Sequence, residues 1–333
     1  MISLWPQTPL AAPGDTPQQI KNLVFPSGRQ CVTHALDIMG GQRRWLTAIP
    51  EYSSHCLISS VAKKTTPLPI SVATAHPELI RTVIIYCQWG WEKPQKSLRE
   101  VQSHFADAKL IIDMVDSVHS TLDGLVLDVN DETVFQVFSL SKTLGLGGGG
   151  IILGGHTWIA NEDAPVDEEI KLANELYSIC KQRSERTQAL TKTWLLADMP
   201  LLSPGLNEWL EENDLCAALA LATEARKAHN EAVLRFIGQL GWEPWMVQQI
   251  ETTEGRLPGI LPLFLDGHKD AAKLKNEIET EVGVELALYH FNRSESYCAS
   301  DWVPCLAVPL HWQLNVEKVE TVIQMWLHFI QKA

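Results

Sequence analysis

Short apolar runs rich in β-branched residues recur through the first half of the chain, and segments of helical periodicity lie between several of them. The runs span 44–50, 81–89, 109–115, 133–141 and 150–155. Segments 29–40 and 96–108 repeat apolar residues at helical spacing, and the first ends at a glycine. Continuous apolar strands that alternate with helices predict an α/β fold with a mainly parallel sheet covered on both faces.

The second half has a different pattern, with longer helices and fewer strands. Its expected elements are long helices at 167–190 and 214–242 and strands near 258–265 and 285–290. The segment 199–207 contains proline and glycine and separates the two helices. A closing helix is expected at 315–330, with Asn315 as its N-cap. We therefore expect a large domain at 1–205 and a smaller C-terminal α+β domain at 206–333.

Composition narrows the class of function. The chain has 333 residues, of which 45% are apolar, and a formal net charge of -13 without any long basic block. This charge argues against nucleic acid or a membrane as partner and favours a small-molecule substrate. Seven scattered cysteines without a C-x-x-C pair indicate neither a disulfide framework nor a metal site. No apolar run approaches the roughly 18 residues of a membrane span, and the N-terminus lacks a signal pattern, so we expect a cytoplasmic protein.

The glycine run at 145–150 can be interpreted in two ways. Its G-x-G-x-x-G spacing is that of a dinucleotide cradle, which would indicate a dehydrogenase. Such a cradle needs a helix directly after the glycines, and an acidic residue at a strand end about 20 residues later. The glycines instead lead into 151–155, a β-branched run followed by glycine, and 167–177 has a helical pattern. We therefore discount the dinucleotide interpretation.

The second interpretation starts from Lys142, which directly precedes the glycines. A lysine amine with a pKa of about 10.4 is almost wholly protonated at neutral pH, but as an imine with an aldehyde cofactor it becomes exchangeable. Pyridoxal phosphate (PLP) uses a lysine in this way and needs an acidic partner for its ring nitrogen. Asp113, at the end of an apolar strand, is placed to be that partner, and Val115 would face the same side. Taken alone, Asp113 is more typical of a turn or a helix N-cap, but its position one strand, turn and strand before Lys142 favours the cofactor role.

A phosphate site is expected where Ser27 and Gly28 open the helix at 29–40. The free amides at Arg29 and Gln30 and the positive end of the helix dipole would suit a phosphate. A plain capped helix start explains the same residues equally well. Ser139 and Ser141, which flank the lysine, would add hydroxyl donors.

These motifs resemble, in order along the chain, those of the fold-type-I PLP enzymes, and most closely the DegT/DnrJ/EryC1/StrS sugar aminotransferases. Segment 27–40 is similar to the S-G-T-S-A-L helix start of that family, and 110–124 to its D-x-A-[QH] strand. Segment 138–153 resembles F-S-x-x-x-K with its glycines. Near the C-terminus, 308–323 is similar to L-P-L-H-P-x-L-[ST], and this match narrows the resemblance to the sugar aminotransferases.

The resemblance implies specific roles. Lys142 would hold the cofactor and shuttle protons, Asp113 would pair with the ring nitrogen, and Ser139 would bind the phosphate. The implied reaction moves an amino group from glutamate to a keto-sugar carried on a nucleotide, in polysaccharide or aminosugar synthesis. The implied assembly is a homodimer with its sites at the subunit interface.

Several positions depart from the family pattern. Asp116 stands where relatives have Gln or His, which places a second acid beside the cofactor. Ser54 stands where relatives have the aromatic residue that stacks on the ring, so Tyr52 or His55 would take that role, and we favour His55. These departures leave two alternatives open: another fold-type-I PLP enzyme, namely a lyase, decarboxylase or amino-acid aminotransferase, or a non-catalytic relative that retains the cofactor.

Overall fold

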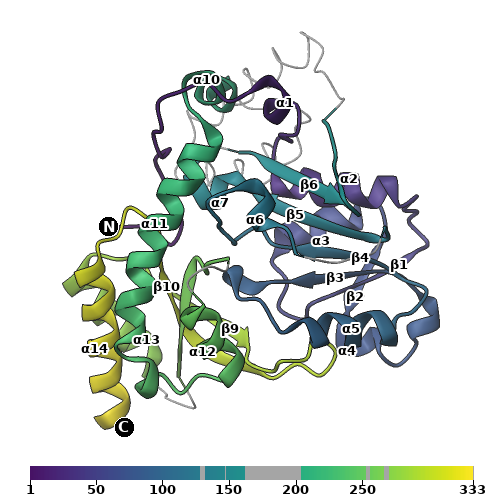
Figure 1. The fold of residues 1–333 in the computed structure, drawn as a ribbon. Coiled ribbons are helices and arrows are strands. Elements are labelled where there is room, and N and C mark those ends of the chain that lie inside the picture. The colour runs from purple at the N-terminus through teal and green to yellow at the C-terminus, as the bar shows by residue number, and fades with distance from the viewer. Residues whose placement is uncertain (128–131, 147, 162–203, 253–255, 266–269, 333) are drawn as a thin grey trace, which may run out of the picture.

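A seven-stranded sheet forms the centre of the first half of the chain in the computed structural model (Figure 1). The structure describes residues 1–127, 132–146, 148–161, 204–252, 256–265 and 270–332. In the sheet order, the strands are β2 (Thr66–Pro69), β1 (Leu46–Ile49), β3 (Ile80–Tyr86), β4 (Lys109–Asp113), β5 (Val134–Ser139), β6 (Gly150–Gly154) and β7 (Thr157–Trp158). β1 to β5 all run parallel to one another, whereas β6 is antiparallel to β5 and β7 is antiparallel to β6. The predicted fold class is confirmed, although β2 and β7 were not predicted.

Helices cover both faces of this sheet because its central strands are apolar on both sides. Ile84 of β3 packs with α2 (Gly28–Ile38) and α3 (His55–Ala62), whereas the adjacent Val83 and Ile85 belong to the core of the opposite face. The helices of that opposite face are α4 (Ile70–Ala73), α5 (Gln95–His104) and the N-terminal half of α11 (Leu215–Leu234). Burial on both faces explains why these strands are continuous apolar runs in the sequence.

A second, antiparallel sheet of three strands has its own core. Its order is β8 (Ile260–Phe264), β10 (Trp302–Pro309) and β9 (Ala287–Asn292). The helices around it are α12 (Pro244–Glu251), α13 (Ala271–Val282) and α14 (Val316–Lys332). The central strand β10 was not predicted, because Pro304 interrupts its apolar pattern and proline is unusual inside a central strand.

The remaining expectations have mixed outcomes. Asn315 caps α14 as predicted, since its Oδ1 accepts a hydrogen bond from the Lys318 amide at 3.1 Å. The helix expected at 167–190 lies outside the described residues. The helix expected at 214–242 is shorter, because α11 ends at Leu234. The domain division at 205 stays a prediction.

Short helices complete the described chain. They are α1 (Gln18–Lys21), α6 (Leu122–Leu125), α7 (Leu140–Leu144), α10 (Pro204–Glu212) and the 3-10 turns Pro77–Leu79, Gln88–Gly90 and Ile237–Gln239. Helix α10 packs against the core of the first sheet through Leu206 and Trp209. Across the described segments, no helix has both the length and the apolar character that crossing a membrane requires.

The glycine run brings the start of β6 against the start of α2. The backbone of Gly150 exchanges hydrogen bonds with Phe25 at 2.8 and 2.9 Å, and the Gly149 amide donates to the Pro26 carbonyl at 2.8 Å. A Cβ atom at Gly150 would lie 2.7 Å from both the Gly28 amide nitrogen and the Cys31 Sγ. The run therefore permits a close backbone approach and continues into a strand, which excludes the dinucleotide interpretation.

Replacing Gly150 with alanine should destabilise the protein. The added Cβ meets backbone atoms at a distance that requires them to move, so we expect the free energy of unfolding to fall by about 1–3 kcal/mol. Chemical denaturation measures this change. Gly238→Ala is the matched control, because no heavy atom lies within 4 Å of its Cβ position. Equal stability of the two variants would contradict the proposed role of Gly150.

Candidate active site

The predicted lysine and aspartate come together at the carboxyl ends of the central strands. Asp113 ends β4, and Lys142 lies on α7, which directly follows β5. β4 and β5 are parallel neighbours, with Asp113 opposite Val137, so both strands end at the same edge. On the other side of β4, Tyr86 at the end of β3 lies opposite Asp113. The edge where strands end is where α/β sheets place their ligands.

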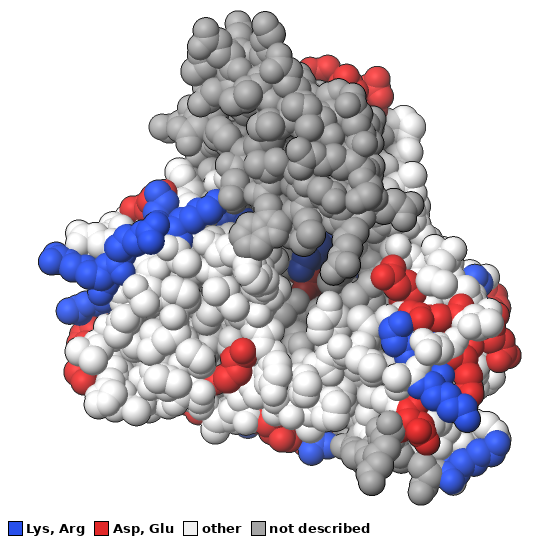
Figure 2. Space-filling view, turned by 180° about the vertical axis from the view of Figure 1, so that it is seen from behind, with Lys and Arg blue, Asp and Glu red and all other residues white. Residues whose placement is uncertain are grey.

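An ion pair between Lys142 and Asp116 is the central contact of this site. Lys142 Nζ lies 3.0 Å from Asp116 Oδ1, and the Asp116 side chain is fully buried. The Tyr86 hydroxyl donates to Asp116 Oδ2. Arg226 of α11, which is 1% exposed, donates to the backbone carbonyl of Asp116 at 2.9 Å. Asp116 is therefore held from three sides. On the surface, Figure 2 shows a small basic patch next to a small acidic one in a recess.

The protonation of Lys142 depends on its two acidic neighbours. Burial alone would lower the pKa of Lys142, but the negative charges of Asp116 and Asp113 outweigh burial and raise that pKa above its ordinary value. In the absence of a bound cofactor, the lysine is therefore an ammonium ion at neutral pH. Its side chain remains 35% exposed, which leaves the amine accessible.

Asp113 has a different environment. It is 7% exposed, and its Oδ1 accepts a hydrogen bond from the Val115 amide at 3.2 Å. Burial raises the pKa of Asp113 to about 7; the charge of Lys142 lowers it and that of Asp116 raises it. A buried carboxyl group with so few donors is suited to a partner that brings its own proton.

The phosphate site predicted at the start of α2 lies next to Ser139. A Cβ atom at Gly28 would be 3.1 Å from Val115 Cγ1 and 3.4 Å from Ser139 Cβ, so the helix start touches both positions. Ser139 and Ser141 share a hydrogen bond between their hydroxyl oxygens at 2.9 Å.

The predicted use of the helix amides needs a correction at Gln30. Its amide donates to Ser27 Oγ at 3.2 Å, because Ser27 caps the helix, so it is not free for a phosphate. Arg29 lies in the first turn of the same helix, beside Gly28. The phosphate role of Arg29, Ser139 and Ser141 stays a prediction.

Tyr52 and His55, the two candidates for ring stacking, contact other side chains of the protein. Tyr52 stacks on His290 with 4.4 Å between ring centroids, and it is 56% exposed. His55 begins α3 on the surface, where its Nδ1 is 3.1 Å from Ser59 Oγ. The stacking role of Tyr52 or His55 stays a prediction.

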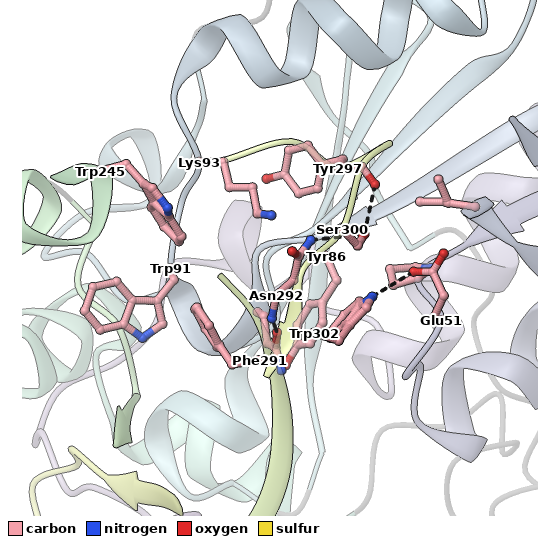
Figure 3. Close-up of a pocket in the computed structure, with 13 residues that line it drawn as sticks. Glu51, Tyr86, Trp91, Lys93, Trp245, Phe291, Asn292, Tyr297, Ser300 and Trp302 are labelled. Atoms are coloured by element: carbon pink, nitrogen blue, oxygen red, sulfur yellow. Dashed lines mark hydrogen bonds between the residues drawn. The ribbon is translucent and has the colours of Figure 1, made fainter. Parts of the chain in front are cut away.

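An aromatic pocket adjoins this cluster and shares Tyr86 with it (Figure 3). Its walls come from the chain after β3 and from β9 and β10, and they include Trp91, Phe291 and Trp302. Lys93 points into the pocket; its amine donates to the Ser296 carbonyl at 3.0 Å and lies 4.8 Å from the Tyr297 ring centroid. Burial lowers the pKa of Lys93 to about 7. The pocket is small, with a volume of about 20 Å³, which is room for roughly one water molecule beside the central cluster.

Sequence reasoning missed three residues of the central cluster. Tyr86 had a usable signal, because it ends the strand next to Asp113 and parallel strands end at one edge. Arg226 lies within an ordinary amphipathic pattern on α11, and Trp5 stands in an N-terminal segment without periodicity. The Trp5 ring lies over Lys142 with 4.7 Å between Nζ and the ring centroid. Nothing near Arg226 or Trp5 in the sequence indicates these contacts.

The fold has many known relatives. An aromatic aminotransferase from Pyrococcus horikoshii OT3 matches with a TM-score of 0.52 at 14% identity, covering 99% of this chain and 96% of that one. A Streptococcus pneumoniae protein titled "Putative sugar aminotransferase Spr1654" matches with a TM-score of 0.53 at 14% identity, covering 98% and 99%. DesV from S. venezuelae matches with a TM-score of 0.54 at 14% identity, covering 93% and 85%. No curated protein matches the chain by sequence.

The fold, with its lysine and aspartate at the strand ends, is that of the fold-type-I PLP-dependent transferases. Residues 15–200 match the model of a family described as "Putative PLP-dependent aminotransferase". This match covers more than half of the chain, and the chain belongs to that family of PLP-dependent aminotransferases. Its cofactor is pyridoxal phosphate.

The residues at the site fit this cofactor. The buried carboxyl of Asp113, whose pKa is raised to about 7, suits a protonated ring nitrogen. Lys142 supplies an amine, and the Ser139 and Ser141 hydroxyls supply donors beside the start of α2. Gly28 leaves room at the position where a Cβ atom would crowd Val115.

Asp113 should make the stability of the cofactor-free protein depend on pH. Its folded pKa of about 7 lies above the ordinary value of about 3.9, so between these values the folded state binds more protons than the unfolded chain. The contribution of Asp113 to the free energy of unfolding therefore falls as pH rises through this window. The Asp113→Asn variant has no carboxyl group here and should not lose this contribution. Its free energy of unfolding minus that of wild type should therefore rise by up to about 4 kcal/mol from pH 4 to pH 8.

Urea denaturation of the cofactor-free proteins at the two pH values measures this difference. Asp107→Asn is the control, because Asp107 is exposed on the surface. If the stability difference between Asp113→Asn and wild type were the same at both pH values, the raised pKa of Asp113 would be wrong.

Proposed function

We propose that this aminotransferase moves an amino group from glutamate to a keto-sugar carried on a nucleotide, with Lys142 as its catalytic lysine. The observation that carries the proposal is the cluster of Lys142, Asp113 and Asp116 at the strand ends, beside the start of α2. As in the resemblance to the DegT/DnrJ/EryC1/StrS group, the protein would act as a cytoplasmic homodimer.

Pyridoxal phosphate supplies an electron sink that makes the bonds at the substrate's α-carbon labile. Asp113 would keep the proton on the ring nitrogen, because its carboxylate is stabilised in this buried site only when a positive partner is next to it. Ser139, Ser141 and the first amides of α2 would hold the phosphate. Val115, which lies against Gly28, would line the same space.

When the substrate amine has replaced Lys142 on the cofactor, the free Lys142 amine would carry a proton between the carbon atoms of substrate and cofactor. Asp116 would control this proton, because its charge favours the ammonium form of Lys142 across a distance of 3.0 Å. Burial, followed by the charge of Asp116, raises the pKa of Tyr86 well above its ordinary value, so its hydroxyl remains a donor to Asp116. Tyr86 would thereby hold Asp116 in the orientation that faces the lysine.

Two observations support a sugar acceptor. The C-terminal segment 308–323 resembles the corresponding ending of the sugar aminotransferases. The structural relative from S. pneumoniae is titled as a sugar aminotransferase, which is consistent with this acceptor.

A second candidate is transfer of the amino group to a 2-oxo acid. Asp116 favours it, since the sugar aminotransferases of the resemblance have Gln or His at this position. Lys142 and Asp113 would have the same roles in both candidate reactions.

The proposed function is tested in two half-reactions on the purified PLP-loaded protein. Glutamate should bleach the visible absorbance of the bound cofactor, and a keto-sugar nucleotide added afterwards should restore it. Asp113→Asn should lower the rate of bleaching by several orders of magnitude while the fold is retained, because the ring nitrogen loses its acidic partner. Asp107→Asn is the matched control and should behave as wild type.

A panel of nucleotide-linked keto-sugars and 2-oxo acids distinguishes the two candidates. If only 2-oxo acids restore the visible absorbance of the cofactor, the sugar proposal is wrong and the second candidate replaces it. Absence of bleaching by every amino donor tried would contradict both.

A further inference from the structure

The N-terminal segment crosses the active site and contacts the helix that carries Lys142. We call residues 2–10 the N-terminal strap. Trp5 lies near its middle, and its ring covers the Lys142 amine at 4.7 Å. Leu4 is buried in the core of the three-stranded sheet, which we call the small sheet. The hydrophobic core on the α5 side of the seven-stranded sheet contains none of residues 2–8. The strap therefore runs from the small sheet to α7.

The strap is fixed to the small-sheet side at its beginning. Ile2 pairs with Val284, and its amide donates to the Gly283 carbonyl at 2.8 Å. His311 Nε2 donates to the Ser3 carbonyl at 2.8 Å. Burial lowers the pKa of His311 to about 4, so the ring is neutral at pH 7, and a carbonyl partner requires the proton on Nε2. One tautomer of His311 thus holds the strap two residues before Trp5.

The strap is fixed to α7 at its end. The Leu10 amide donates to the Leu144 carbonyl at 2.9 Å. Gly145, which ends α7 with a φ of +72°, lies so close that a Cβ atom there would be 2.2 Å from the Thr8 carbonyl oxygen. Between the anchors at Ser3 and Thr8, the Gln7 amide donates a hydrogen bond to Gln313 Oε1 at 3.1 Å. Trp5 is therefore held between two anchored ends.

We propose that Trp5 is a positioning residue for Lys142 and that the strap exists to present it. The face of an indole ring attracts a cation, so Trp5 adds to the effect of Asp116 and favours the ammonium form of the lysine. The ring also covers one side of the amine and limits the direction from which a reactant approaches it. This inference concerns the lysine of the proposed function and rests on that function for its role in catalysis, but the contact itself can be tested without cofactor or substrate.

The test measures the reactivity of Lys142 in the cofactor-free protein. Trace acylation with acetic anhydride over a series of pH values, followed by mass spectrometry of the peptide that contains Lys142, gives both the pKa and the rate of reaction of this amine. Trp5→Ala should lower that pKa by about 0.4–1.5 pH units and increase the rate, because the ring no longer favours the cation or covers it. Trp5→Phe should restore part of both effects. Circular dichroism confirms that each variant is folded.

Two further variants separate positioning from general damage. Gln313→Ala loosens the strap without changing Trp5 or Lys142, and it should shift the pKa of Lys142 in the same direction by a smaller amount. Trp158→Ala removes a half-buried tryptophan from the sheet edge at β7 and should leave Lys142 unchanged.

Unchanged reactivity of Lys142 in a folded Trp5→Ala variant would overturn the inference. If Lys142 responds as expected but the wild-type protein transfers no amino group, the proposed function fails and the role of Trp5 toward the lysine remains.

Discussion

The ion pair between Lys142 and Asp116 is the interaction on which the site depends. Asp116 is fully buried, and a buried charge is favourable only when further partners satisfy it. Tyr86 and Arg226 supply these partners, the first through its hydroxyl and the second through the backbone carbonyl of Asp116. Because the partners come from β3 and α11, α11 must be packed beside the seven-stranded sheet before Asp116 is held in place.

The local geometry around this pair follows from close backbone contacts. Gly150 lets β6 approach the start of α2, and Gly145 lets the N-terminal strap approach α7. In both places the distance to a hypothetical Cβ is below 3 Å, so any other residue would separate elements that form the site. The glycine run that resembles a dinucleotide motif is thus a packing feature of an aminotransferase fold.

Much of the fold could be predicted from the sequence because its signals are local. The strands β1, β3, β4, β5 and β6 are apolar runs, and Asp113 and Lys142 stand at the ends of two neighbouring runs. The strand β10 could not be predicted, since its pattern contains proline and its pairing is with distant segments. For the same reason Trp5 and Arg226 were missed, because their contacts join residues more than 100 positions apart. The helix expected at 167–190 lies outside the described residues.

The identity of the lysine that binds the cofactor is the most direct test of the account. The chain has a rival in Lys93, whose pKa of about 7 leaves more of its amine unprotonated at neutral pH than that of Lys142. Borohydride reduction of the PLP-loaded protein fixes the cofactor covalently to its lysine, and peptide mapping by mass spectrometry then locates it. The account predicts the added mass on Lys142. Its appearance on Lys93, or on any other lysine, would contradict the site described above.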